Sequence, residues 1–469
     1  MDILLSHGYF IAEDEHEQEV MKPYPPLGLM YLSSHLKANG FGVDIFDSTF
    51  RTMKEFKSYV AEMQPAIVGL SCNLSTKARV LEQIRICKEN GAWVILGGPE
   101  PVSYADAYLE AGADVVVVGE GELTLAELIP HLASMGSQNL DKIAGIIYLD
   151  VEGKPTKTAT RSPIADLSAQ PWPDREAVDL DRYHDTWKTR HGYSSTSLIT
   201  ARGCPYVCNW CSHTVFGFTH RRREPEDVVE EVAWLIERYN PDQLWYADDV
   251  LTINPRWFLR YVELLKERGI RKPFECISRA DRLTEEIVNA LSEIGCRRLW
   301  IGAESGSQRI LEAMERRTEV EDIQIKTKLL QARGIEVGMF IMLGYEGEEE
   351  SDIRATIDHL KRANPDHFLT TVAYPIKGTK YYESVEDRIF TNQAWEERTD
   401  RDLLVAGRHS PAYYNHATRW MVNEVNLHKA RLSGASNYLK KVKMLVNANR
   451  GRFGMRMTQN DREGPRTEN

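Results

Sequence analysis

The sequence predicts an α/β protein in which two alternations of strands and helices are followed by a mainly helical region. Short apolar runs rich in Val and Ile recur between residues 1 and 150, and stretches with helical periodicity separate them. The same alternation resumes at about residue 196. Beyond about residue 380 the strand signal fades while the helical signal remains. A chain of 469 residues is long enough for two or three domains with cores of their own.

The first alternation predicts a doubly wound parallel sheet. Its apolar runs are continuous, which is typical of strands buried on both faces. The expected strands are 2–6, 42–46, 66–71, 93–98, 114–119 and 144–149. The expected helices are 27–39, 53–63, 75–90, 103–111 and 122–135. We therefore expect a Rossmann-like domain over residues 1–150.

Ligands of such sheets bind outside the carboxyl ends of the strands. Two of those ends carry the sequences GGPEP (97–101) and GEGE (119–122). Glycine lets a backbone approach a large ligand closely, so the candidate cofactor-binding residues here are Gly97, Gly98, Gly119 and Gly121. His7 ends the first strand, and we expect an ordinary loop residue there rather than a metal ligand.

A second alternation follows a segment, 151–195, that is rich in Pro, charge and aromatic residues and is expected to be a linker folded onto its neighbours. Six β/α units then span residues 196–379. Their expected strands are 196–200, 243–247, 274–278, 298–302, 337–343 and 367–374. Eight units would complete a barrel, so six predict a partial, TIM-like (β/α)6 barrel. Residues 380–469 are expected to be mainly helical and to end in a disordered tail.

Composition excludes several classes of protein. The net charge of −11 argues against general nucleic-acid binding. No apolar run reaches the roughly 18 residues that span a bilayer, and no export signal is visible. Seven cysteines in a long chain do not suggest a disulfide scaffold, so we expect a reducing cytoplasm and inert core thiols at the four scattered positions. The basic stretch 425–460 could face an anionic substrate or a membrane surface, although such stretches are more often solvated helix faces.

The remaining three cysteines are spaced Cys204-x3-Cys208-x2-Cys211. Structural zinc takes four ligands, usually in two separated pairs, and no second pair is present. A redox pair of Cys208 and Cys211 would leave Cys204 without a role. Iron–sulfur clusters use closely spaced thiolates, usually four. Three thiolates leave one iron without a protein ligand, where a small molecule can chelate.

A CxxxCxxC motif at the end of the first strand of a partial barrel resembles that of radical S-adenosylmethionine (radical SAM) enzymes. The resemblance covers roughly residues 195–375 and implies that Cys204, Cys208 and Cys211 hold a 4Fe–4S cluster. It also implies that SAM binds the open iron and is split to methionine and a 5′-deoxyadenosyl radical by an electron from the cluster.

The same resemblance implies residues for SAM at the ends of later strands. Asp248 and Asp249 stand where the family often has a Gly-Gly-Glu that takes the SAM amino group. Arg279 suits the SAM carboxylate, and Glu304 and Ser305 suit the ribose hydroxyls. Their position at carboxyl ends of barrel strands favours these roles over solvated loop charges.

Three further positions are placed near the adenine by the resemblance. Gly338 and Gly344 belong to a segment similar to the family's adenine-side strand, and Trp210 precedes the last cysteine. Turn glycines and ordinary packing are the alternatives.

The N-terminal domain resembles the cobalamin-binding domain of class B radical SAM methyltransferases. The segments YPPLGLMYLSSHLKANGFGVDIFD (24–47), LGGPEP (96–101) and VVGEGE (117–122) carry this likeness. The Asp-x-His-x-x-Gly signature of other cobalamin proteins is absent, as it is from many class B members. The alternative is a degenerate domain that binds nothing.

Together these resemblances imply a cobalamin-dependent radical SAM methyltransferase acting on an unactivated carbon or a phosphorus centre. The anaerobic magnesium-protoporphyrin monomethyl ester cyclase, an oxidative cyclase with the same architecture, is the first alternative. A methylthiotransferase and a cobalamin or iron–sulfur sensor are less favoured. The expected partners are a small-molecule substrate and an electron donor such as flavodoxin or ferredoxin. No transmembrane segment is expected.

Overall fold

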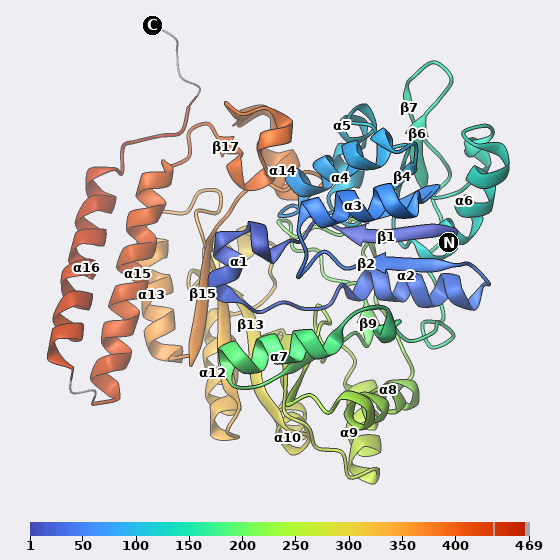
Figure 1. The fold of residues 1–469 in the computed structure, drawn as a ribbon. Coiled ribbons are helices and arrows are strands. Elements are labelled where there is room, and N and C mark those ends of the chain that lie inside the picture. Colours follow the sequence, from blue (N-terminus) through green and yellow to red (C-terminus); the bar gives the residue numbers. More distant parts are fainter. Residues whose placement is uncertain (435–436, 465–469) are drawn as a thin grey trace, which may run out of the picture. The chain divides into compact units, whose positions relative to one another are not determined.

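The computed structural model describes residues 1–434 and 437–464, which fold into two compact units (Figure 1). The first unit contains Met1–Pro205, Ser212–Ala247 and Gln393–Thr399. The second contains Tyr206–Cys211, Asp248–Asn392 and the described residues from Asp400 onward. The predicted disordered tail falls in part on residues 465–469, which lie outside the described residues.

The main sheet of the first unit has seven strands in the order β2-β1-β3-β4-β5-β6-β7. Its first five strands are parallel and lie at the expected positions. They are β1 (Ile3–His7), β2 (Val43–Phe46), β3 (Ile67–Ser71), β4 (Trp93–Gly97) and β5 (Val115–Val117). Parallel strands in this order place all their carboxyl ends at one edge of the sheet.

Helices cover both faces of this sheet. Alternate strand residues such as Leu4 and Val68 form one core, to which α3 (Met53–Met63), α4 (Lys77–Glu89) and α5 (Ala105–Glu110) contribute. The intervening residues, such as Ile3 and Ile67, form a second core with α2 (Leu27–Ala38) and α6 (Glu122–Met135). Burial on both faces explains the continuous apolar runs and confirms the doubly wound class.

Three details of the first unit differ from the sequence expectation. Strand β6 (Ile146–Leu149) pairs with β5 antiparallel, and it also pairs antiparallel with the unexpected β7 (Pro155–Lys157). An apolar run indicates a buried strand but not its direction. The short helix α1 (Glu15–Val20) was not expected, because its polar sequence has no apolar stripe.

The segment after β7 is anchored by buried charges. It contains α7 (Leu180–His191) and leads into β8 (Ser195–Leu198), which pairs in parallel with β11 (Gln243–Tyr246). Arg175 of this segment forms a fully buried ion pair of 2.9 Å with Glu231 of α8 (Pro225–Tyr239) and donates to the carbonyl of Ser197. Such a pair fixes the segment because neither charge is stable alone in the interior.

The second unit contains four parallel strands in the order β15-β14-β13-β12. With β8 and β11 of the first unit, they are the six strands predicted for the partial barrel. Their bounds are β12 (Phe274–Ser278), β13 (Cys296–Glu304), β14 (Glu336–Leu343) and β15 (His367–Val372). The helices of this part are α9 (Pro255–Glu267), α10 (Glu285–Glu293), α11 (Gln308–Ala313), α12 (Val320–Ala332) and α13 (Glu350–Ala363).

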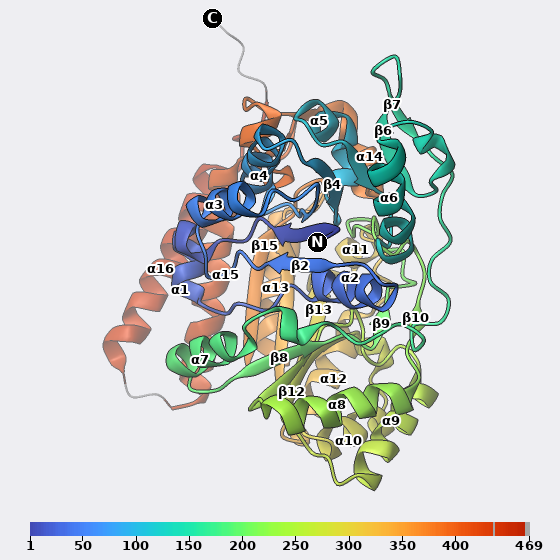
Figure 2. The same cartoon turned by 45° about the vertical axis from the view of Figure 1, so that its right-hand side comes forward.

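The rest of the second unit is mainly helical, as expected. It contains α14 (Lys380–Val385), a short antiparallel pair of β16 (Ile389–Phe390) and β17 (Leu404–Val405), and then α15 (Pro411–Leu432) and α16 (Tyr438–Met457). The last two helices lie side by side in Figures 1 and 2. Over residues 1–434 and 437–464, no helix is both long and apolar enough to cross a bilayer.

Candidate functional site

The first unit has a cavity at the carboxyl ends of its parallel strands. Its empty volume is about 850 Å³, including the space at its mouth. The four glycines expected to bind a cofactor, Gly97 and Gly98 at the end of β4 and Gly119 and Gly121 after β5, all line it. Val215 and Phe216, from the loop that carries the cysteines, line it too. A concave, largely apolar pocket at this edge is the usual ligand site of such sheets.

The glycines of this cavity do two different things. A Cβ at Gly97 would have no atom within 4 Å, so this backbone borders open space and presents a bare peptide to the cavity. Gly98 has a φ of +106°, and a Cβ there would lie 2.2 Å from the carbonyl oxygen of Cys72. Gly97 therefore leaves room for a ligand, while Gly98 is required by the turn itself.

Buried ion pairs join the cavity to the base of the cysteine loop within the first unit. Glu120, which lines the cavity, contacts Arg202 of β9 (Ala201–Arg202) at 2.7 Å and Arg221 of β10 (Arg221–Arg222) at 2.7 Å. Glu122 contacts Arg202 at 2.6 Å. Burial alone would lower the pKa of Arg202, but the two carboxylates hold it above its ordinary value. The Arg202 guanidinium therefore stays charged, and the ion pairs of Arg202 and Arg221 hold both ends of the loop.

Strands β9 and β10 pair antiparallel and close the loop 203–220 at its base. Gly203 begins the loop with a φ of +86°, and a Cβ there would lie 2.4 Å from the carbonyl oxygen of Thr219. Cys204 is half-buried, Cys208 is buried and Cys211 is exposed, and none is in a disulfide. In the part of the chain that the structure describes, no three His, Cys, Asp or Glu side chains gather as ligands of one metal ion. The cysteine ligands of an iron–sulfur cluster bind different iron atoms, so they do not need to converge on one metal ion.

Two guanidiniums contact the Cys208 thiol within the second unit. Nη1 of Arg316 lies 3.6 Å and Nη1 of Arg279 lies 3.9 Å from Cys208 Sγ. Arg279 also lies over the ring of Tyr206, with its Cζ atom 3.8 Å from the ring centre. The two guanidiniums place positive charge beside this sulfur. This donor set therefore fits an anionic iron–sulfur cluster.

Arg279 has several partners in its own unit. Its Nε donates to Asp281 at 2.8 Å, and its Nη2 donates to the carbonyl of Arg316 at 2.9 Å and to Thr318 at 3.1 Å. Arg316 in turn donates to the carbonyl of Gly302 at 2.7 Å. Both arginines thus tie the cysteine loop to the ends of β12 and β13.

The other predicted SAM residues have distinct surroundings. Asp248 is buried and Asp249 is exposed. Glu304 has a φ of +58°, and its burial raises the pKa of the carboxyl, which Arg316 and Arg279 oppose. The Ser305 hydroxyl lies 3.2 Å from that of Thr356 on α13.

The residues predicted near adenine are packed within the second unit. Trp210 packs against a cluster that includes Ile310, Met314 and Tyr381. Gly338 lies beside Trp300 of β13, whose Cε3 atom would be 2.3 Å from a Cβ at this position. The glycine therefore makes room for the indole.

Gly344 forms a small polar group with a buried carboxyl. Its N–H donates to Glu348 at 2.5 Å, while the other carboxyl oxygen of Glu348 has no hydrogen-bond partner among the described residues. Burial raises the pKa of Glu348 to about 8, and the nearby Asp352 raises it further while Arg408 and Arg309 oppose this. Glu348 is therefore mostly protonated in the folded protein near neutral pH.

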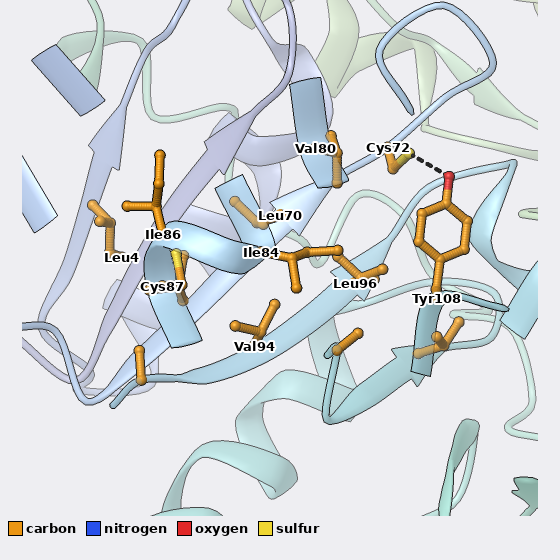
Figure 3. Close-up of a cluster of buried hydrophobic side chains, with 14 of the residues drawn as sticks. Leu4, Leu70, Cys72, Val80, Ile84, Ile86, Cys87, Val94, Leu96 and Tyr108 are labelled. Atoms are coloured by element: carbon orange, nitrogen blue, oxygen red, sulfur yellow. Dashed lines mark hydrogen bonds between the residues drawn. The ribbon is translucent and has the colours of Figure 1, made fainter. Parts of the chain in front are cut away.

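The scattered cysteines are core residues, as expected. Cys72, Cys87, Cys276 and Cys296 are all buried. Cys72 directly follows β3, and its Sγ lies 3.1 Å from the hydroxyl of Tyr108. Figure 3 marks this contact with a dashed line. Burial raises the pKa of Cys72 and raises that of Cys87 to about 12, so both remain neutral thiols. His7 is not a spare ligand either, because its Nε2 lies 3.1 Å from Asp47 and its Nδ1 accepts from the N–H of Tyr9.

Fold and site together define an α/β protein that has a glycine-lined cavity at the strand ends of its first sheet and a three-cysteine loop after β8, the first strand of a partial barrel. Residues 198–360 match the Radical SAM superfamily, and residues 18–129 match the B12 binding domain. The chain thus contains a radical SAM domain and an N-terminal B12-binding domain, as both resemblances implied.

Three known proteins illustrate this similarity. An uncharacterised methyltransferase of Pyrococcus horikoshii is 27% identical, over 82% of this chain and 84% of its own. The anaerobic magnesium-protoporphyrin IX monomethyl ester cyclase of Rubrivivax gelatinosus is 25% identical, over 81% of this chain and 70% of its own. The structure of the radical SAM methyltransferase TsrM of Kitasatospora setae, with cobalamin and a [4Fe–4S] cluster bound, has a TM-score of 0.70 at 20% identity, over 84% of this chain and 81% of that one.

Replacing Glu120 with Ala is expected to lower Tm by about 10 °C, because it leaves two buried guanidiniums without their shared carboxylate. Glu127→Ala is the matched control, since its ion pair with Arg161 involves a carboxylate that is 51% exposed and should cost less than about 1 kcal/mol. Differential scanning calorimetry measures both. Equal losses of Tm would contradict the anchoring role of Glu120.

Replacing Glu348 with Gln should remove a pH dependence of stability. The folded carboxyl keeps its proton up to about pH 8, while the unfolded chain releases it near the ordinary value of 4.5. The unfolding free energy of the unaltered protein therefore falls as the pH rises through this range, and the Gln variant gains relative stability. Tm measured at about pH 6 and about pH 8.5 tests this, with the exposed Glu312→Gln as control. A constant difference in Tm between the variant and the unaltered protein would refute it.

Proposed function

We propose that this chain is a cobalamin-dependent radical SAM methyltransferase that acts on an unactivated carbon or a phosphorus centre of a small molecule. The observation that carries the proposal is that one chain matches both the Radical SAM superfamily and the B12 binding domain. The sheet of the B12-binding domain also has a glycine-lined cavity at its strand ends. The proposed domains are 1–150 for cobalamin, 151–195 as linker, 196–379 as the radical SAM core and 380–469 as the C-terminal region.

Cys204, Cys208 and Cys211 are the proposed ligands of a 4Fe–4S cluster. When bound, this group supplies the electron that cleaves SAM. The chain contributes the β9–β10 pair that holds the loop ends and two guanidiniums that contact the Cys208 thiol. Arg316 and Arg279 compensate the negative charge expected of a thiolate-bound cluster.

Cobalamin is assigned to the cavity of the first unit. Gly97 presents backbone without a side chain to that space, and Gly98, Gly119 and Gly121 shape the adjoining turns. Closing such a cavity over a ligand excludes water from the reacting groups.

SAM is assigned to the residues predicted from the strand ends of the radical SAM core. Two of them contact Arg316, whose guanidinium contacts Cys208: Arg279 donates to its backbone carbonyl, and Glu304 lies 3.9 Å from its Nε. The complete proposed set is Trp210, Asp248, Asp249, Arg279, Glu304, Ser305, Gly338 and Gly344.

The similarity to the monomethyl ester cyclase supports one second candidate, an oxidative cyclisation with the same cofactors. Methyl transfer is preferred because two of the three similar proteins described above are methyltransferases. We further propose a cytoplasmic location and a flavodoxin or ferredoxin as electron donor.

The deciding experiment uses protein purified without oxygen from cells supplied with hydroxocobalamin. Iron, sulfide and cobalt are assayed together with the ultraviolet–visible spectrum, and SAM with a deuterated methyl group is then offered under reducing conditions with candidate substrates. A cluster absorption, stoichiometric cobalt and deuterium in the product support the proposal. Iron and sulfide without cobalt would overturn the methyltransferase assignment, and a product that is cyclised but unlabelled would favour the cyclase.

Cys208→Ala should abolish cluster assembly and SAM cleavage while the N-terminal domain remains folded. The removed thiolate is one of only three proposed ligands, whereas Cys87→Ala removes a buried thiol far from the motif in sequence. Iron and sulfide assays and the yield of 5′-deoxyadenosine check this. SAM cleavage by Cys208→Ala, or loss of the cluster from Cys87→Ala as well, would refute the ligand assignment.

Gly97→Leu should lower cobalt content by at least about tenfold and leave iron unchanged, because the new side chain projects into the cavity. Gly464→Leu is the matched control, since that glycine also has no atom within 4 Å of a Cβ but does not line the cavity. Full cobalt binding by Gly97→Leu would exclude cobalamin from this cavity.

A further inference from the structure

Helix α16 has apolar side chains on two opposite faces. One face packs on α15, where Ala448, Gly451 and Met455 are buried. A Cβ on Gly451 would lie 2.5 Å from the backbone nitrogen of Trp420, so the two helices are in close contact and the orientation of α16 is fixed. Figures 1 and 2 show α15 lying between α13 and α16.

The opposite face carries an exposed apolar stripe. At 3.6 residues per turn, its members fall within roughly 100° of the helix circumference. The exposed fractions are 80% for Leu439, 68% for Phe453 and 68% for Met457. The whole stripe, used below under that name, is Tyr438, Leu439, Val442, Val446, Phe453 and Met457.

Basic residues border the stripe along the helix. Lys443 and Arg450 follow it on one side, and Arg452 and Arg456 lie on the other. Residues 425–460 contain eight Lys or Arg and no Asp or Glu, although the chain as a whole has a net charge of −11. Apolar side chains bordered by cations are the pattern of a helix that lies in the surface of an anionic bilayer.

We propose that α16 docks this protein on an anionic lipid surface. The stripe would enter the boundary between headgroups and acyl chains, and the flanking Lys and Arg side chains would reach the phosphates. A second copy of the chain is a poorer occupant, because two-fold pairing of α16 would bring like charges together. The proposal does not depend on the reaction that the protein catalyses.

The test is vesicle flotation with the full-length holoprotein. Vesicles of phosphatidylcholine alone are compared with vesicles that also contain phosphatidylglycerol. We expect binding only to the anionic vesicles, and weaker binding at high salt because the headgroup charges are screened.

Phe453→Asp is expected to weaken anionic-vesicle binding by about tenfold or more, and Met457→Asp is a second variant of the same face. Ile325→Asp makes the same change at a residue of α12 that is 54% exposed, and it should leave binding intact. Circular dichroism verifies that each variant is folded. The proposal would be overturned if the protein did not bind anionic vesicles, or if Phe453→Asp and Met457→Asp left that binding unchanged. It would also be overturned if light scattering showed a dimer that Phe453→Asp dissociates.

Discussion

The buried ion pairs of Glu120 are the interaction on which the cavity-bearing edge of the first unit depends. This carboxylate follows β5 and contacts Arg202 and Arg221, which begin and end the loop that carries the cysteines. A carboxylate that is 6% exposed is stable only when it is paired. The end of the sheet and the base of the loop are therefore formed together, and loss of either leaves an uncompensated buried charge. The cavity wall and the loop base thus depend on one set of contacts.

The strands and their ends have separate tasks. Along the strands, apolar residues on both faces supply the burial that holds the helices in place, as Val68 and Ile67 do in adjacent positions of β3. At the carboxyl ends, glycines replace large side chains and charged residues replace apolar ones. This division lets the binding edge change without loss of the core. In the second unit, Arg279 lies directly after β12 and contacts Cys208, so the same principle applies to the loop that carries the cysteines.

Much of the fold could be predicted because burial imposes a visible period on the sequence. Strand β12 and helix α3 begin and end where the sequence places them. The direction of β6 could not be read, since it depends on which neighbour the strand meets. The site was predictable only as residues at strand ends. Arg316 was missed because it lies in the turn after α11, and only the folded chain brings its guanidinium to Cys208. The indole of Trp300 beside Gly338 was missed for the same reason, since the contact joins two strands.

The outer face of α16 differs from the rest of the second unit because its apolar side chains are not buried on folding. Phe453 is 68% exposed, so it contributes little burial to folding, and the contacts of α16 with α15 come from the opposite face. An exposed apolar stripe also carries a cost, because contiguous patches of this kind promote association. The flanking cations reduce association between copies of the chain, since they repel one another, and they favour an anionic surface instead. The charges and the stripe therefore act in the same direction, toward a lipid surface and away from self-association.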